Sequence, residues 1–98
     1  MVVLSAELRF HISDAHSLKE KRKVCRSLID GAKRKFNAAI AEVDTQDAHQ
    51  LLTLGVAVVS GEPFHAREML DAVIRTLEKH AEEHAEAQLM NVEQFDAT

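Results

Sequence analysis

The sequence predicts an α+β sandwich in which two helices pack on one face of a four-stranded antiparallel sheet. Three observations lead to this prediction: an alternating apolar pattern at the amino end, two segments with apolar residues at helical spacing, and three further strand-like segments. Their order is strand, helix, strand, strand, helix, strand. The chain has 98 residues, of which 46% are hydrophobic and 29% charged, a balance typical of one globular domain. We therefore expect a single domain over residues 1–98, with an ordered core from about 2 to 93 and a polar tail.

The first strand and the first helix are the best-defined elements. Apolar and polar side chains alternate from Val2 to Ile12, the period of a strand with one buried face. Ser17 is followed three residues later by Glu20, a capping box in which each side chain should bond to the backbone N–H of the other residue. A helix should begin there and run to about Lys35. Its apolar stripe contains Leu18, Val24, Cys25, Leu28, Ile29, Ala32 and Phe36.

Shorter signals define the remaining elements. Residues 37–43 and 50–60 are predicted to be strands, and the polar stretch between them is of hairpin type. Pro63 is tolerated in a first helical turn, and an apolar face at helical spacing continues from Ala66 to Ala81. A short last strand is expected at about 88–93.

This order of elements predicts a ferredoxin-like βαββαβ fold, with two right-handed crossovers joined by a hairpin. The sheet face opposite to the helices is then open. We expect it to carry side chains from the first and third strands: Ser5, Glu7, Arg9 and His11, and Leu51, Ala57 and Val59. A face of this mixed character is also one through which such a domain could form a homodimer.

Charge is distributed unevenly along the chain. The net charge is −4, yet residues 1–40 carry nine Lys and Arg against four Asp and Glu, and residues 41–98 carry three against twelve. The apolar runs are too short to span a bilayer, and the amino end does not have the pattern of a signal peptide. A single cysteine, Cys25, excludes an internal disulfide, and we interpret it as a small core residue. We expect a cytoplasmic protein without a membrane partner.

Six cations share the side of the first helix opposite to its apolar stripe. They fall within about 60° of one line and form a basic ridge about 20 Å long. Such a ridge could contact RNA phosphates; the alternative is a solvated helix face, on which Asp30 could pair with Arg26 or Arg34. Lys21 points into the apolar stripe instead, where it must snorkel to solvent or meet a carboxylate such as Glu42. The predicted nucleic-acid-binding residues are Lys19, Lys21, Arg22, Lys23, Arg26, Lys33 and Arg34.

Motifs along almost the whole chain match those of one known family. In chain order they are His16–Arg22, Ser27–Asp30, Phe36–Asn37, Ala41–Val43, Gln46–Asp47 and Leu54–Ala57. In these segments the chain resembles the YlxP-like family of small bacterial proteins of unknown function. The resemblance implies a ferredoxin-like domain without enzymatic activity, whose gene often lies beside those of translation initiation factor two and ribosome-binding factor A. One departure is His49, where the family tends to have tryptophan.

Other polar clusters have ordinary structural explanations. His80 and His84 are four residues apart on a helix and could share a metal ion, but the sequence places no third ligand. A second group could converge at the loop before the first helix: His11, Asp14 and His16. Three carboxylates lie in or beside the predicted hairpin: Glu42, Asp44 and Asp47. They could do acid–base chemistry, but polar residues are equally expected in a hairpin. We predict no metal, no cofactor and no catalytic residue.

The chain lacks the usual RNA-binding signals of sheet proteins. It has no Tyr or Trp with which to stack bases, and no GxxG loop, so any RNA would be bound by charge and shape. We expect a non-enzymatic accessory factor for ribosomal RNA, a ribosomal subunit or a ribosome-assembly intermediate, the ribosome being implied by the resemblance. The alternatives are a protein-interaction module that dimerises through the open sheet face, and an enzyme that uses the loop before the first helix.

Overall fold

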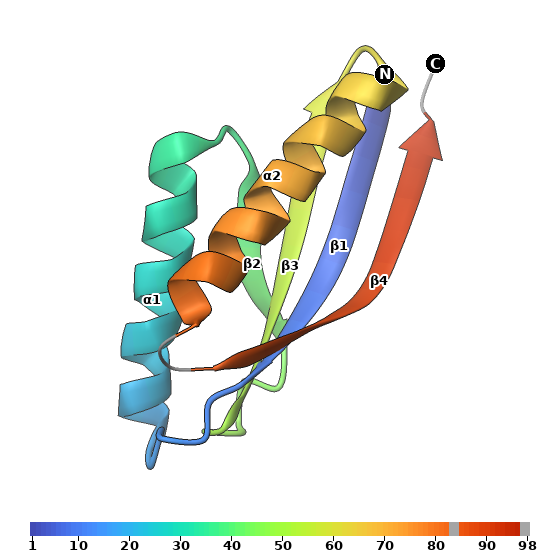
Figure 1. Cartoon of the computed structure of the whole chain (residues 1–98). Helices are drawn as coiled ribbons and strands as arrows, with labels where there is room; N and C mark the ends of the chain where they lie inside the picture. The colour runs from blue at the N-terminus through green and yellow to red at the C-terminus, as the bar shows by residue number, and fades with distance from the viewer. Residues whose placement is uncertain (83–84, 97–98) are drawn as a thin grey trace.

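The computed structural model describes residues 1–82 and 85–96, and it confirms the ferredoxin-like topology (Figure 1). The four strands form one antiparallel sheet in the order β2-β3-β1-β4, and both helices cover the same face of that sheet. The elements are β1 (Val2–His11), α1 (Leu18–Lys35), β2 (Ala39–Asp44), β3 (Leu51–Ser60), α2 (Pro63–Ala81) and β4 (Glu86–Asp96).

The core lies between the sheet and the two helices. Alternate residues of β1 are buried, and those after Val2 are each paired across the sheet with a buried residue of β3, for example Leu4 with Val58 and Leu8 with Leu54. Helix α1 contributes Leu28 and Ala32, and α2 contributes a longer stripe: Ala66, Leu70, Val73, Ile74, Leu77 and Ala81. Removing these apolar surfaces from water is the main force that holds the helices on the sheet.

Strand β4 is longer than the sequence predicts. It pairs with β1 over its whole length, from Glu86 opposite His11 to Asp96 opposite Val2. The register shifts between Glu7 and Leu8 of β1, where Met90 is an extra residue on β4. A bulge of this kind reverses the alternation of side chains inside the predicted segment 88–93. The residues that the prediction omits, 86–87 and 94–96, are mostly polar and do not show the apolar pattern of a strand.

Both helices begin at a side-chain cap, and one detail of the first cap differs from the prediction. Ser17 Oγ accepts a hydrogen bond of 3.2 Å from the backbone N–H of Glu20, as expected. The Glu20 carboxylate, however, accepts from the backbone N–H of His16 at 2.8 Å, rather than from that of Ser17. The glutamate therefore ties the preceding loop to the helix, one residue further back than in a standard capping box.

The cap of α2 was not predicted. The Glu62 carboxylate accepts hydrogen bonds from the backbone N–H groups of Phe64 at 2.9 Å and His65 at 2.7 Å. These two bonds hold the pKa of Glu62 below its usual value of 4.5, because they stabilise the charged carboxylate.

Candidate nucleic-acid interface

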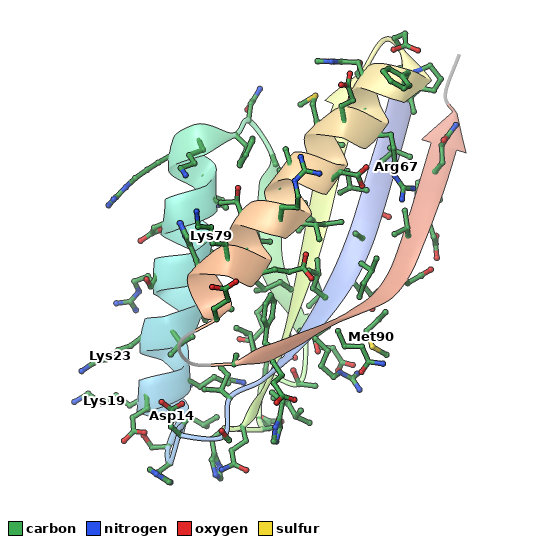
Figure 2. All side chains as sticks on the ribbon, in the orientation of Figure 1. Asp14, Lys19, Lys23, Arg67, Lys79 and Met90 are labelled. Carbon is green, nitrogen blue, oxygen red and sulfur yellow. The ribbon has the colours of Figure 1, made fainter. Side chains whose placement is uncertain are left out.

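The outer face of α1 is the most strongly charged surface of the described residues. The helix carries eight Lys and Arg against two acidic residues, whereas α2 carries three against three. Seven of the α1 cations are exposed, and six of these lie on the outer side of the helix, where Figure 2 shows Lys19 and Lys23. We call this set of six the basic surface: Lys19, Arg22, Lys23, Arg26, Lys33 and Arg34. Lys33, at the margin of this side, also lines a hollow together with residues of β1, β2 and β3.

Asp30 does not pair with the arginines of the basic surface. Asp30 lies four residues from both Arg26 and Arg34, yet within α1, which is described throughout, it forms no ion pair with either. On α2, by contrast, Arg67 Nε lies 3.2 Å from an Asp71 carboxylate oxygen. Within the described residues, the cations of the basic surface therefore form no ion pair, whereas α2 carries equal numbers of basic and acidic residues.

Lys21 does not belong to the basic surface, although the sequence analysis includes it in the binding set. Its side chain is only 1% exposed, because this position faces the sheet in the middle of the helix's inner side. The ammonium group does not snorkel to solvent. It donates to four oxygens: Glu42 Oε2 at 2.9 Å, and the carbonyls of Thr45 at 2.8 Å, Gln46 at 3.2 Å and Leu51 at 3.3 Å. A phosphate cannot reach it there.

The buried lysine organises the connection between β2 and β3. Three of its four partners are backbone carbonyls of this connection and of the first residue of β3. Thr45, one of those partners, has a φ of 63°, a left-handed conformation that is unfavourable for a β-branched residue. Its hydroxyl also lies 3.1 Å from that of Thr53. The ammonium group and this side-chain contact together hold the strained turn in place.

Cys25 is half-buried beside the core and is not an activated nucleophile. Burial raises the pKa of its thiol, and the Glu42 carboxylate raises it further, against smaller opposing effects of Lys21 and Arg26. The thiol is thus protonated at neutral pH, the opposite of what a reactive cysteine needs.

The remaining polar clusters have structural partners or do not assemble. Glu42 binds Lys21, and Asp44 accepts from the backbone N–H of Thr45 at 2.8 Å and lies 3.8 Å from Arg9. Among the residues that the structure describes, no three His, Cys, Asp or Glu side chains are placed to hold a metal ion, and this includes the loop before α1. The predicted pair of His80 and His84 extends beyond the described residues.

A shallow hollow of about 260 Å³ interrupts the basic surface. Its lining comes from successive turns of α1: Arg22, Cys25, Arg26, Ile29 and Asp30. A row of two arginines and a carboxylate thus lies beside a row of two apolar side chains. Sequence analysis places these residues on the helix but does not predict the hollow, since its shape depends on side-chain conformations.

The open face of the sheet carries a second, more apolar hollow of about 480 Å³. Small residues of the three strands β1, β3 and β2 form much of its lining, among them Ser5, Ala57 and Ala41. Gly55 lies there opposite Val43, whose side chain would be only 2.7 Å from a Cβ at position 55. Nearby on the same face, Val59 is 57% exposed and Phe95 51% exposed. The register confirms that Leu51, Ala57 and Val59 share this face with the polar residues of β1.

Comparison with known proteins identifies the family. A family model described as "Protein of unknown function (DUF503)" matches residues 3–94. The chain belongs to the DUF503 family. It is 35% identical over 77 residues to the "Uncharacterized protein YlxP" of Bacillus subtilis (strain 168), a match that covers 79% of this chain and 84% of that protein. The predicted YlxP-like resemblance is confirmed.

Solved structures share the fold at low sequence identity. The de novo designed protein LFR1 1, with a ferredoxin fold, has a TM-score of 0.61 and 16% identity, covering 92% of this chain and 84% of its own. SnoaB, a cofactor-independent oxygenase from Streptomyces nogalater, has a TM-score of 0.59 and 10% identity, covering 100% and 95%. A C-terminal segment of the alpha subunit of aIF2 from Pyrococcus abyssi has a TM-score of 0.58 and 12% identity, covering 90% of this chain and 48% of that one. At these identities the likeness concerns the fold alone. Neither helix in the described part of the chain is long and apolar enough to cross a membrane.

Proposed function

We propose that this DUF503 protein is a non-enzymatic accessory factor that binds ribosomal RNA, or a ribosome-assembly intermediate, through the basic surface of α1. The observation that supports this proposal is a row of six exposed cations that no carboxylate of α1 neutralises. A solvated helix face would be expected to balance such charges, as α2 does with Arg67 and Asp71.

The dimensions of the surface suit a nucleic-acid backbone. Lys19 and Arg34 are fifteen residues apart on one helix, a distance of about 22 Å at 1.5 Å per residue. Cations spaced along this length can contact several consecutive phosphates and release their counterions, which supplies affinity without reading sequence. The open face of the sheet offers no Tyr or Trp, and within the described residues Phe95 is the one phenylalanine on it, so this mode of binding uses charge rather than a row of stacking aromatics.

The choice of ribosomal RNA over other RNA depends on the YlxP-like resemblance and the translation-related gene neighbours that it implies. The charge and shape of α1 are compatible with any structured RNA. The test must therefore identify the RNA as well as the surface that binds it.

Capture from a bacterial lysate, with and without ribonuclease, tests both points. We compare the parent with two variants that each lose two arginines and one lysine: Arg22→Gln/Lys23→Gln/Arg26→Gln on α1, and Arg67→Gln/Arg75→Gln/Lys79→Gln on α2. The account predicts that the parent and the α2 variant retain ribosomal RNA, and that the α1 variant loses most of it. Equal recovery of RNA by the two variants would refute the proposal, as would recovery of ribosomal components that ribonuclease leaves unchanged.

The open sheet face supports a second candidate function, a protein-interaction module that forms a homodimer. Three of the exposed large hydrophobic side chains of the described residues lie on this face: Val43, Val59 and Phe95. Burying them in a dimer would remove apolar area from water at roughly 25 cal/mol per Å².

Sedimentation at high micromolar concentration tests this candidate. Val59→Lys should convert a dimer to a monomer, whereas Phe64→Lys should not, since Phe64 is 71% exposed but lies on the first turn of α2. A parent protein that sediments as a monomer excludes the homodimer.

A further inference from the structure

The hollow on α1 is lined by a carboxylate, although a surface that binds RNA phosphates should be positively charged. Asp30 lies within the basic surface, where a negative charge weakens the attraction for phosphate. It forms no ion pair with Arg26 or Arg34, so neutralising those arginines is not its role in this structure. Its carboxylate is instead at the rim of a hollow whose lining includes Cys25 and Ile29.

We propose that this hollow binds one unpaired guanine base of the RNA; this rests on the proposed function and names the base that the same surface reads. Asp30 accepts hydrogen bonds from the guanine N1–H and N2–H groups. Cys25 and Ile29 provide an apolar floor for the ring. Arg22 and Arg26, which lie in the same row along the helix as Asp30, stack on the base or bind its flanking phosphates through their planar guanidinium groups.

Hydrogen-bond chemistry selects guanine among the four bases. An ionised carboxylate only accepts hydrogen bonds, and its two oxygens can receive a pair of parallel donors. On its Watson–Crick edge guanine presents two adjacent donors, whereas adenine and cytosine present a single amino group and uracil a single imino group. The two acceptor oxygens of Asp30 therefore match the two parallel donors of guanine in number and direction.

The hollow has the size and polarity that a single base requires. It measures about 260 Å³ and is open to solvent, so a planar ring system can lie in it without displacing the helix. The thiol at its floor is protonated, since burial raises the pKa of Cys25, so the floor is neutral as well as apolar. Bases in RNA loops can be splayed out into such a site, whereas paired bases cannot.

Asp30→Asn changes RNA affinity in opposite directions for a guanine-binding Asp30 and for a merely solvated one. If Asp30 is only a solvated residue, Asp30→Asn removes a repulsive charge and tightens binding to every RNA alike. If Asp30 reads guanine, the same substitution weakens binding to the guanine RNA relative to other RNAs, because the amide presents one acceptor and a misplaced donor.

The probes are two hairpin RNAs that differ at one position of an otherwise uridine loop, which holds guanine in one and inosine in the other. Inosine lacks only the N2 amino group. The parent protein should bind the guanine hairpin roughly tenfold more tightly than the inosine hairpin, a difference within the range of a good bidentate contact. Asp30→Asn should abolish this preference while binding the inosine hairpin at least as tightly as the parent does. Glu68→Gln, which removes one exposed negative charge from α2, should leave the preference intact.

Each outcome has a distinct meaning. Equal affinity of the parent for both hairpins overturns the guanine site but leaves the basic surface as an RNA-binding surface. The guanine site is also overturned if Asp30→Asn increases the affinity for both hairpins by the same factor. A parent that binds neither hairpin at low salt overturns the proposed function together with this inference.

Discussion

The inner and outer faces of α1 both carry lysine, but the lysine is buried and hydrogen-bonded on the inner face and exposed to solvent on the outer face. Lys21 is buried against four oxygens, whereas Lys23, two residues later, extends into solvent as Figure 2 shows. Two residues correspond to about 200° around the helix, enough to move a lysine from the sheet side to the solvent side. The comparison shows that a dense basic motif in a sequence can contain one structural cation among several that are free to bind a partner.

The largest expected effect comes from breaking the buried pair. Lys21→Met should lower the free energy of unfolding by about 3–5 kcal/mol, because it leaves Glu42 and three carbonyls without their partner in the protein interior. Lys23→Met, the matched change on the outer face, should change it by less than about 0.5 kcal/mol. Urea unfolding of both variants measures the difference. Similar stabilities for the two would show that Lys21 is not structural.

A smaller effect is expected at the start of the helix. Ser17→Ala should lower the free energy of unfolding by about 1 kcal/mol, since it removes the acceptor of the Glu20 N–H. Ser27→Ala, on an exposed part of α1, is the matched control and should be nearly neutral. Thermal or urea unfolding of both variants tests the cap.

The same cap should matter to the outer face if it fixes the first basic residues in position. Ser17→Ala should then reduce RNA affinity more than Ser60→Ala, an equally uncharged change that removes the acceptor of the Glu62 N–H just before α2. Equal RNA affinities for these two variants, measured at one salt concentration, would leave the Ser17 cap with a folding role only.

The smallest expected effect is the pH dependence contributed by α2. The pKa of Glu62 is lower in the folded protein than its usual value of 4.5, so its contribution to stability is present above that value and is lost as the pH falls through the lower folded pKa. Glu62→Gln should therefore give a shallower loss of stability below pH 4.5 than the parent shows. Urea unfolding at a series of acidic pH values measures both curves, and identical slopes would contradict this role of Glu62.

Sequence patterns predict most of the fold, for reasons visible in particular residues. The alternation of β1 and the Ser17 cap are local signals, and both appear in the structure. The length of β4 was mispredicted because its ends, 86–87 and 94–96, are mostly polar and are held in the sheet by backbone pairing with β1. The Glu20 bond to His16 depends on the path of the loop, which the spacing of a capping box does not specify.

The candidate site was predicted less completely. Helical angles place the basic surface correctly, and they also place Lys21 on the inner face, where Glu42 was named as one candidate partner. Its other partners are backbone carbonyls 24 to 30 residues away, and the sequence pattern of a chain gives no signal for a carbonyl. The hollow beside Asp30 likewise depends on side-chain packing that periodicity does not describe.

The salt dependence of RNA binding tests the central claim, that the outer face of α1 binds phosphates, most directly. The dissociation constant of the purified protein for a ribosomal RNA fragment is measured over a range of salt concentrations, for the parent and the two charge-matched triple variants. Each lost phosphate contact should lower the slope of log Kd against log salt by roughly one, so the account predicts a slope lower by about three for Arg22→Gln/Lys23→Gln/Arg26→Gln. The slope for Arg67→Gln/Arg75→Gln/Lys79→Gln should equal that of the parent. The same slope in all three proteins would contradict the account.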